Sequence, residues 1–140
     1  MKLSPDEIMV LLDDVFPQVR GRYEIVSMND QETHVRLKVG DAQLRPGGTV
    51  SGPSMFGLAD CAMYIAVLGA IGPEALAVTT NCSIDFMRKP EATDMIAVAR
   101  ILKQGRVLVV GDVMLYSEGM DKPVARASLT YSIPPKKGKA

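Results

Sequence analysis

The chain has 140 residues, of which 47% are hydrophobic and 23% are charged, and its formal net charge at pH 7 is zero. A chain of this length is long enough for one domain that buries about two thirds of its surface. The zero net charge argues against a general nucleic-acid binder, because such proteins need an excess of positive charge to meet phosphates.

A helix is predicted at the start of the chain, within residues 1–20. Residues 4–7, Ser-Pro-Asp-Glu, form a capping box with proline at the first helical position, and Pro17 ends the segment. No basic segment followed by an apolar one precedes it, so we expect no secretory leader. Further along, a loop at residues 45–48 leads into a much longer helix over residues 53–71, which Gly72 and Pro73 end.

Six strand-like runs complete the pattern, at residues 23–28, 33–39, 78–87, 95–102, 107–116 and 124–133. In the third run, one apolar face is predicted from the alternation of Val78, Thr80, Cys82, Ile84 and Phe86 with the residues between them. Residues 103–106 are predicted to form a hairpin turn, and residues 134–140 a frayed tail. Because the sequence contains no repeat and no linker, we predict a single domain over residues 1–140.

The long helix is apolar on nearly all sides, and Asp60 in its middle is the only charged residue between Arg45 and Glu74. Asp60 interrupts an apolar run shorter than the roughly 20 residues of a membrane span, so we predict a buried core helix. Such a helix must be covered, and an antiparallel sheet curling around it is the simplest solution. The predicted fold class is therefore α+β. A lone carboxylate in this helix is costly to bury unless it is paired, protonated or in use.

The residues around this helix resemble a known family. Arg45-Pro46-x-Gly48-x-x-Ser51-Gly52, followed by Leu58-Ala59-Asp60, resembles the hot-dog fold acyl-CoA thioesterases, and more narrowly the group typified by the phenylacetate-pathway thioesterase. Residues 83–90 and 125–131 also resemble that family, so the likeness runs from about residue 22 to residue 133. The order and spacing of the motifs make the match specific.

The resemblance implies a catalytic aspartate at Asp60, a glycine that holds the oxyanion at Gly52, and a polar residue of the next strand at Thr79. This chain departs from the family pattern at three positions. Ser51 stands where the family usually has a histidine, Pro53 where it has a second glycine, and Arg45 where it has an asparagine. The Gly52 N–H would point outward at the positive end of the helix dipole. Ser51 can offer its hydroxyl to the same oxygen or to a water, but an unassisted hydroxyl is too weak a base to replace histidine.

Gly52 and Asp60 are eight residues apart, which is roughly 12 Å along one helix. They therefore cannot contact the same carbonyl group from one chain. Two such helices packed antiparallel about a two-fold axis would bring Gly52 of one chain to Asp60 of the other, and the family is known for dimers and tetramers. We expect a homo-oligomer with two sites per dimer, each formed by Asp60 and Thr79 of one subunit and by Ser51, Gly52 and Arg45 of its partner.

The resemblance also implies that coenzyme A enters as part of the acyl-CoA substrate, with no separate cofactor. Candidates to bind its phosphates are the cations Arg88, Lys89, Lys103 and Arg106, with Lys136, Lys137 and Lys139 in the tail. Candidates for the acyl pocket are Met55, Phe56, Met63 and Tyr64. With one histidine and two unpaired cysteines, no metal site is predicted, and the free thiols indicate a cytoplasmic location.

Structural roles compete with these functional ones. Asp60 can be a carboxylate satisfied by nearby donors, and Ser51 an ordinary helix N-cap. Cys61 is expected to be a buried, inert thiol, and His34 a solvent-facing residue of an early strand. Two other functions stay open: a hot-dog protein that binds acyl-CoA without catalysis, and a hydratase, which would need a histidine in the site.

Overall fold

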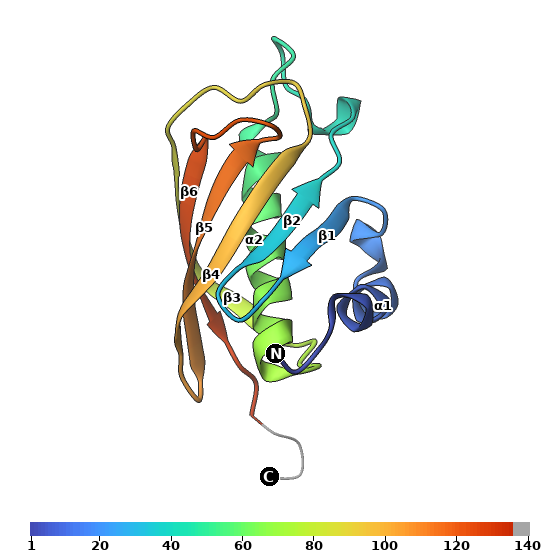
Figure 1. Cartoon of the computed structure of the whole chain (residues 1–140), viewed down its shortest axis with the longest axis vertical. Coiled ribbons are helices and arrows are strands. Elements are labelled where there is room, and N and C mark those ends of the chain that lie inside the picture. The colour runs from blue at the N-terminus through green and yellow to red at the C-terminus, as the bar shows by residue number, and fades with distance from the viewer. Residues whose placement is uncertain (136–140) are drawn as a thin grey trace.

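The long apolar helix predicted from the sequence is the centre of the structure, a computed structural model that describes residues 1–135. This helix, α2 (Gly52–Ile71), runs along the concave side of the sheet (Figure 1). Ser51 is its N-cap residue, and Gly72 ends it with a φ of 97°, a conformation that suits glycine. By length and composition α2 could span a membrane, but 61% of its most apolar stretch is buried inside the protein, so it is a core helix.

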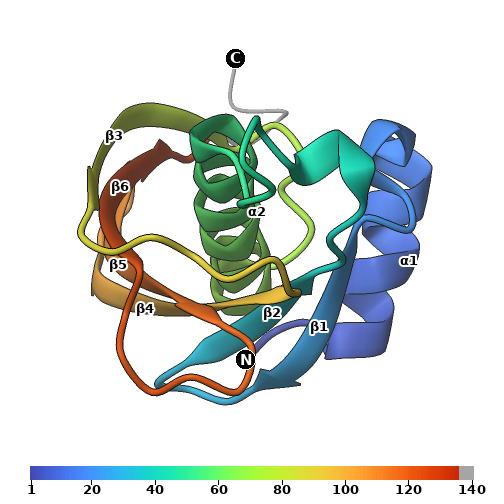
Figure 2. The same ribbon diagram turned by 90° about the horizontal axis from the view of Figure 1, so that it is seen from above.

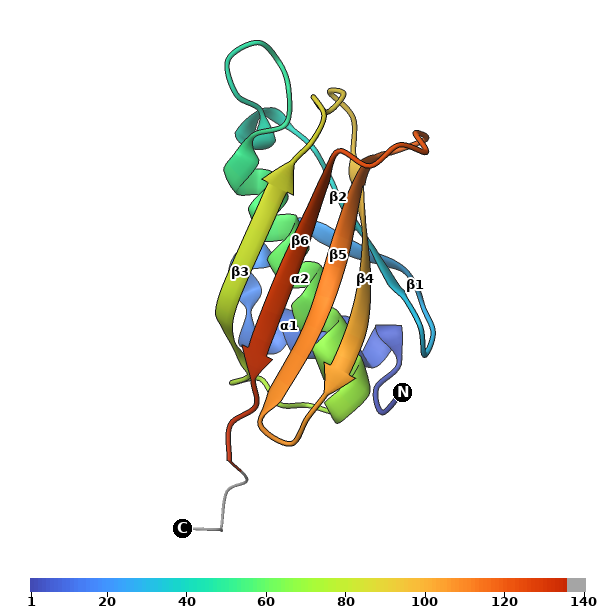
Figure 3. The ribbon, with the colours of Figure 1, turned by 90° about the vertical axis from the view of Figure 1, so that its left-hand side faces the viewer.

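The sheet wraps around α2, as the view from above shows (Figure 2). Its six strands all pair antiparallel in the order β1-β2-β4-β5-β6-β3. The strands are β1 (Tyr23–Met28), β2 (Thr33–Leu37), β3 (Val78–Phe86), β4 (Met95–Gln104), β5 (Leu108–Ser117) and β6 (Ala125–Ser132). The predicted α+β arrangement and the six predicted strands are confirmed, with small differences at the strand ends. Strand β3 lies at one edge of the sheet, beside β6 (Figure 3).

Strand β3 departs from the predicted alternation at its first residues. Its register against β6 shifts between Thr79 and Asn81, so Thr80 is the extra residue of a β-bulge. A bulge changes which side chains share a face of the strand. Thr79 therefore lies on the α2 side together with Cys82, whereas Val78 and Thr80 are exposed. The prediction that Val78 and Thr80 belong to the apolar face was wrong, and the bulge aims Thr79 at α2.

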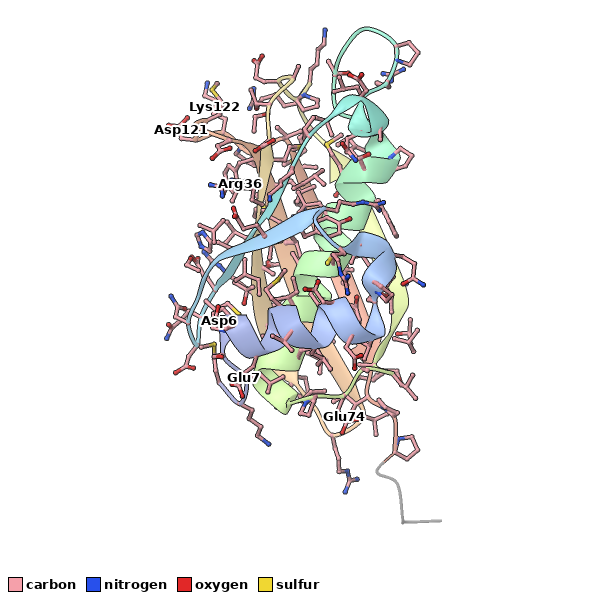
Figure 4. All side chains as sticks on the ribbon, turned by 90° about the vertical axis from the view of Figure 1, so that its right-hand side faces the viewer. Asp6, Glu7, Arg36, Glu74, Asp121 and Lys122 are labelled. Atoms are coloured by element: carbon pink, nitrogen blue, oxygen red, sulfur yellow. The ribbon has the colours of Figure 1, made fainter. Side chains whose placement is uncertain are left out.

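The N-terminal helix covers a flank of α2 that the sheet leaves open (Figures 1 and 2). Helix α1 (Pro5–Val15) has the predicted capping box: the Glu7 N–H donates to the Ser4 hydroxyl at 3.2 Å, and the Ser4 N–H donates to the Glu7 carboxylate at 2.9 Å. Figure 4 labels Glu7 at the start of this helix. A 3₁₀ turn, η1 (Pro17–Val19), follows α1, and a second, η2 (Asp41–Gln43), precedes α2.

Candidate active site

Asp60 lies midway along α2, half-buried, in the wall of a cavity of about 470 Å³. The other walls come from the α1–η1 segment, the start of β1, the loop after α2, and strands β3 and β6. They consist mainly of apolar and aromatic side chains, which include Val15, Phe16, Val19, Tyr23, Tyr64, Ala75, Ala77 and Tyr131. Among residues 1–135, Arg22 is the only cation that lines this cavity. The cavity thus places one carboxylate beside a largely apolar space, an arrangement typical of a small-molecule site.

The two oxygens of the Asp60 carboxylate have different surroundings. Oδ1 accepts a hydrogen bond from the Thr79 hydroxyl at 2.6 Å and another from the Tyr131 hydroxyl at 2.8 Å. Among residues 1–135, no protein donor reaches Oδ2, and no buried side-chain oxygen of that range lacks a partner. Oδ2 is therefore not fully buried and can accept a proton or contact a ligand in the cavity.

The neighbouring hydroxyl and thiol groups are neutral near pH 7. Burial, with the nearby charge of Asp60, raises the pKa of the Tyr131 hydroxyl well above its usual value, so Tyr131 acts as a donor. Burial likewise raises the pKa of the Cys61 thiol to about 12, and the Asp60 charge adds to this effect. Cys61 is thus buried and un-ionised, as predicted, and is a poor nucleophile.

The start of α2 lines a second cavity, of about 530 Å³. As the first residue of α2, Gly52 has an N–H with no acceptor in a preceding helical turn. Arg45, Arg88 and Lys89 line the same cavity, and all three are exposed or partly exposed. Ser51 is occupied as a helix cap, because its hydroxyl accepts from the Ser54 N–H at 3.2 Å and donates to the Ser54 hydroxyl at 2.9 Å.

The structure thus divides the predicted site residues into two groups within one chain. Asp60 and Thr79 meet in the first cavity, whereas Arg45, Gly52, Arg88 and Lys89 line the second. Lys103 and Arg106 line neither cavity and belong to the β4–β5 hairpin, at the end of the molecule opposite to the start of α2 (Figure 1). Lys136, Lys137 and Lys139 lie outside the described residues.

The residues suggested for an acyl pocket also separate. Tyr64 lines the Asp60 cavity and Met55 lines the Gly52 cavity. Met63 is fully buried in the core and Phe56 is 39% exposed, and neither residue lines these two cavities, so their place in an acyl pocket stays a prediction. His34 is half-buried on β2, where its Nε2 lies 2.9 Å from a Glu32 oxygen, and it lines neither cavity.

Tyr131 was not among the predicted site residues, although it contacts Asp60 directly. Two signals pointed to it. A tyrosine on the inward face of a strand needs a partner for its hydroxyl, and a lone buried carboxylate needs donors. What the sequence does not supply is the pairing of β6 with β3, which brings Tyr131 next to Thr79.

Comparison with solved structures identifies the class of fold. The chain is 55% identical to a candidate thioesterase from Silicibacter sp. TM1040, with a TM-score of 0.89 over 95% of this chain and 93% of that one. The PaaI protein from the phenylacetic acid degradation operon of E. coli is 24% identical, with a TM-score of 0.73 over 89% and 94% of the two chains. A hypothetical thioesterase from Streptococcus pneumoniae, solved with coenzyme A, is 22% identical, with a TM-score of 0.72 over 95% and 98%.

These neighbours confirm the predicted hot-dog fold, and they support the prediction that this protein is a thioester hydrolase. The sequence pattern of the thioesterase superfamily matches residues 47–124, which is more than half of the chain. The protein belongs to the thioesterase superfamily. A search of curated proteins finds no match.

Proposed function

We propose that the protein hydrolyses an acyl-CoA thioester to the free acid and coenzyme A, with Asp60 as general base or nucleophile. The observation that carries this proposal is the asymmetry of the Asp60 carboxylate: two donors hold Oδ1, and Oδ2 has no protein donor among residues 1–135. A carboxylate held in this way presents one oxygen in a fixed direction. Oδ2 either removes a proton from a water that attacks the thioester carbonyl or attacks that carbonyl itself.

The second requirement of the reaction is a donor for the oxygen of the tetrahedral intermediate. The Gly52 N–H suits this role, because it lies at the positive end of the α2 dipole and has no helical acceptor. The Ser51–Ser54 hydrogen bonds support it by fixing the first turn of α2. One such donor typically contributes about 2.7–4 kcal/mol to transition-state stabilisation.

A dimer is needed to bring these two parts together, because Asp60 and Gly52 of one chain line different cavities. Strand β3 supports such a dimer. It is a nine-residue edge strand that pairs only with β6 in the described part of the chain, and its end residues Val78 and Phe86 are 57% and 52% exposed. Long free edges of this kind pair readily with another strand. Pairing β3 with β3 of a second copy would continue the sheet and place the two α2 helices side by side and antiparallel.

The cations around Gly52 support coenzyme A as the leaving group. Arg45, Arg88 and Lys89 line the cavity that contains the Gly52 N–H, so phosphates bound there would lie beside the reacting carbonyl group. The streptococcal neighbour was solved with coenzyme A, which is consistent with this ligand.

The test is release of free thiol from a panel of short, medium and aromatic acyl-CoA substrates. We expect turnover by the wild type and a loss of at least about a hundredfold in kcat for Asp60→Asn, which removes the base but keeps the shape. Asp121→Asn, in the exposed turn before β6 (Figure 4), is the matched control and should keep full activity. Full activity in Asp60→Asn would refute the assignment of Asp60, and a wild type that binds acyl-CoA without hydrolysis would refute the proposed reaction.

A further inference from the structure

Two strands converge on a single oxygen of Asp60. Thr79 of β3 and Tyr131 of β6 are register partners across the sheet, and the bulge at Thr80 gives Thr79 its inward direction. Both hydroxyls donate to Oδ1, at 2.6 and 2.8 Å, and the Tyr131 hydroxyl also lies 2.9 Å from the Asp60 backbone carbonyl oxygen. The Tyr131 hydroxyl thus spans the side chain and the main chain of the same residue.

Tyr131 is itself held in place by contacts that do not involve Asp60. It is 3% exposed, and its ring stacks on that of Tyr64 with centroids 6.1 Å apart and an interplanar angle of 19°. Tyr64 lies one helical turn after Asp60, and its hydroxyl donates to the Ala75 carbonyl oxygen at 2.7 Å. The position of the Tyr131 hydroxyl is therefore set by the sheet, by α2 and by the loop after α2.

We infer that Tyr131 is a positioning residue for catalysis, which keeps Oδ1 of Asp60 turned away from the substrate and Oδ2 turned toward it. This inference rests on the proposed function. A carboxylate with free rotation about its last bond would spend part of its time with neither oxygen in line with the carbonyl carbon.

Several titratable groups surround Asp60. They are Tyr23 at the start of β1, Cys61 and Tyr64 on α2, Cys82 on β3 and Tyr131 on β6. Burial raises the pKa of each of these tyrosines and cysteines, so they stay protonated below pH 8. None of them therefore competes with Asp60 as a base or nucleophile at the assay pH.

The test is Tyr131→Phe, which removes the hydroxyl and keeps the ring and its stack on Tyr64. We expect kcat to fall by about tenfold to a hundredfold, the usual effect of losing a hydrogen bond to a charged group. KM should change little, because the ring still lines the cavity. A fall in kcat without a matching change in KM separates lost positioning of Asp60 from lost substrate binding.

Tyr116→Phe is the matched control, because it removes a tyrosine hydroxyl on β5 that does not line the Asp60 cavity and leaves both donors to Asp60 in place. It should keep kcat and KM near the wild-type values. If Tyr131→Phe keeps the wild-type kcat while Asp60→Asn is inactive, the inference fails and the proposed function stands. If Tyr131→Phe changes KM as much as kcat, Tyr131 is a packing residue only and the inference fails as well. A wild type inactive on the whole panel overturns both.

Discussion

Subunit complementation tests the shared active site most directly. The two variants are Asp60→Asn, which removes the base, and Gly52→Pro, which removes the proposed oxyanion donor. Proline is suited to the first helical position, and Ser51 before it has φ −74° and ψ 154°, which is the extended conformation that a residue before proline prefers. We expect each variant alone to lose at least about a hundredfold in kcat, because every site then lacks one of its two parts.

A mixed dimer of the two variants behaves differently. If Asp60 and Gly52 of one chain serve different sites, one site of the mixed dimer carries both substitutions and the other carries neither. Mixed dimers should therefore regain about half of the wild-type kcat per dimer. The distance along α2 supports this expectation, because eight residues of helix separate Gly52 from Asp60 by roughly 12 Å, too far for both to contact one carbonyl group.

Co-expression with two different affinity tags and purification on both isolates the mixed dimers, whose rate is then measured by thiol release. Gly52→Ala is the matched control: an added Cβ lies 3.5 Å from the nearest atom, on the Phe86 ring, and the N–H is kept. It should stay active by itself. Mixed dimers that remain as inactive as their parents would refute the shared site, as would a wild type that is monomeric at assay concentration.

Two further predictions concern stability and thiol chemistry. Gly111→Ala should destabilise the fold by about 1–3 kcal/mol in thermal unfolding, because the added Cβ would lie 2.5 Å from the Arg100 carbonyl oxygen and 2.8 Å from the Met63 sulfur. Gly40→Ala is the control, because its added Cβ would lie 3.6 Å from the nearest atom. Equal stability of the two variants would contradict this packing. Iodoacetamide at pH 8 should leave Cys61 unmodified in the native protein and modify it in urea, because a pKa of about 12 leaves only about one thiol in ten thousand ionised. Peptide mass spectrometry measures the modification. Rapid labelling of Cys61 in the native protein would contradict the prediction.

Most of the fold follows from local signals in the sequence. The capping box at Ser4, the apolar stretch after Pro53 and the glycine at position 72 define the two helices, and the structure confirms all three. The strand runs are equally local. The bulge at Thr80 was missed because it depends on the register between β3 and β6, which no pattern within β3 specifies.

The site was predictable to a smaller degree. Asp60 stands out because it is a single charge in an apolar helix. The resemblance to a known family placed Thr79 in the same site, and the structure shows the hydrogen bond between the two side chains. Two sequence signals pointed to Tyr131, but its proximity to Asp60 arises from strand order rather than from sequence spacing, so no local pattern pairs the two residues. Lys103 and Arg106 have the positive charge that a phosphate site needs, but they lie on a hairpin far from the start of α2. The charge of a residue does not predict its position in the fold.

The wall of the Asp60 cavity has a consequence for how such proteins can diversify. Val15, Phe16 and Val19 belong to the first twenty residues, whereas the carboxylate and its two donors come from α2, β3 and β6. Part of the wall of this cavity thus lies on a different stretch of polypeptide from the carboxylate and its two donors. Under the proposed function, we expect exchange of the N-terminal segment to change which acyl group is accepted while Asp60, Thr79 and Tyr131 stay in place.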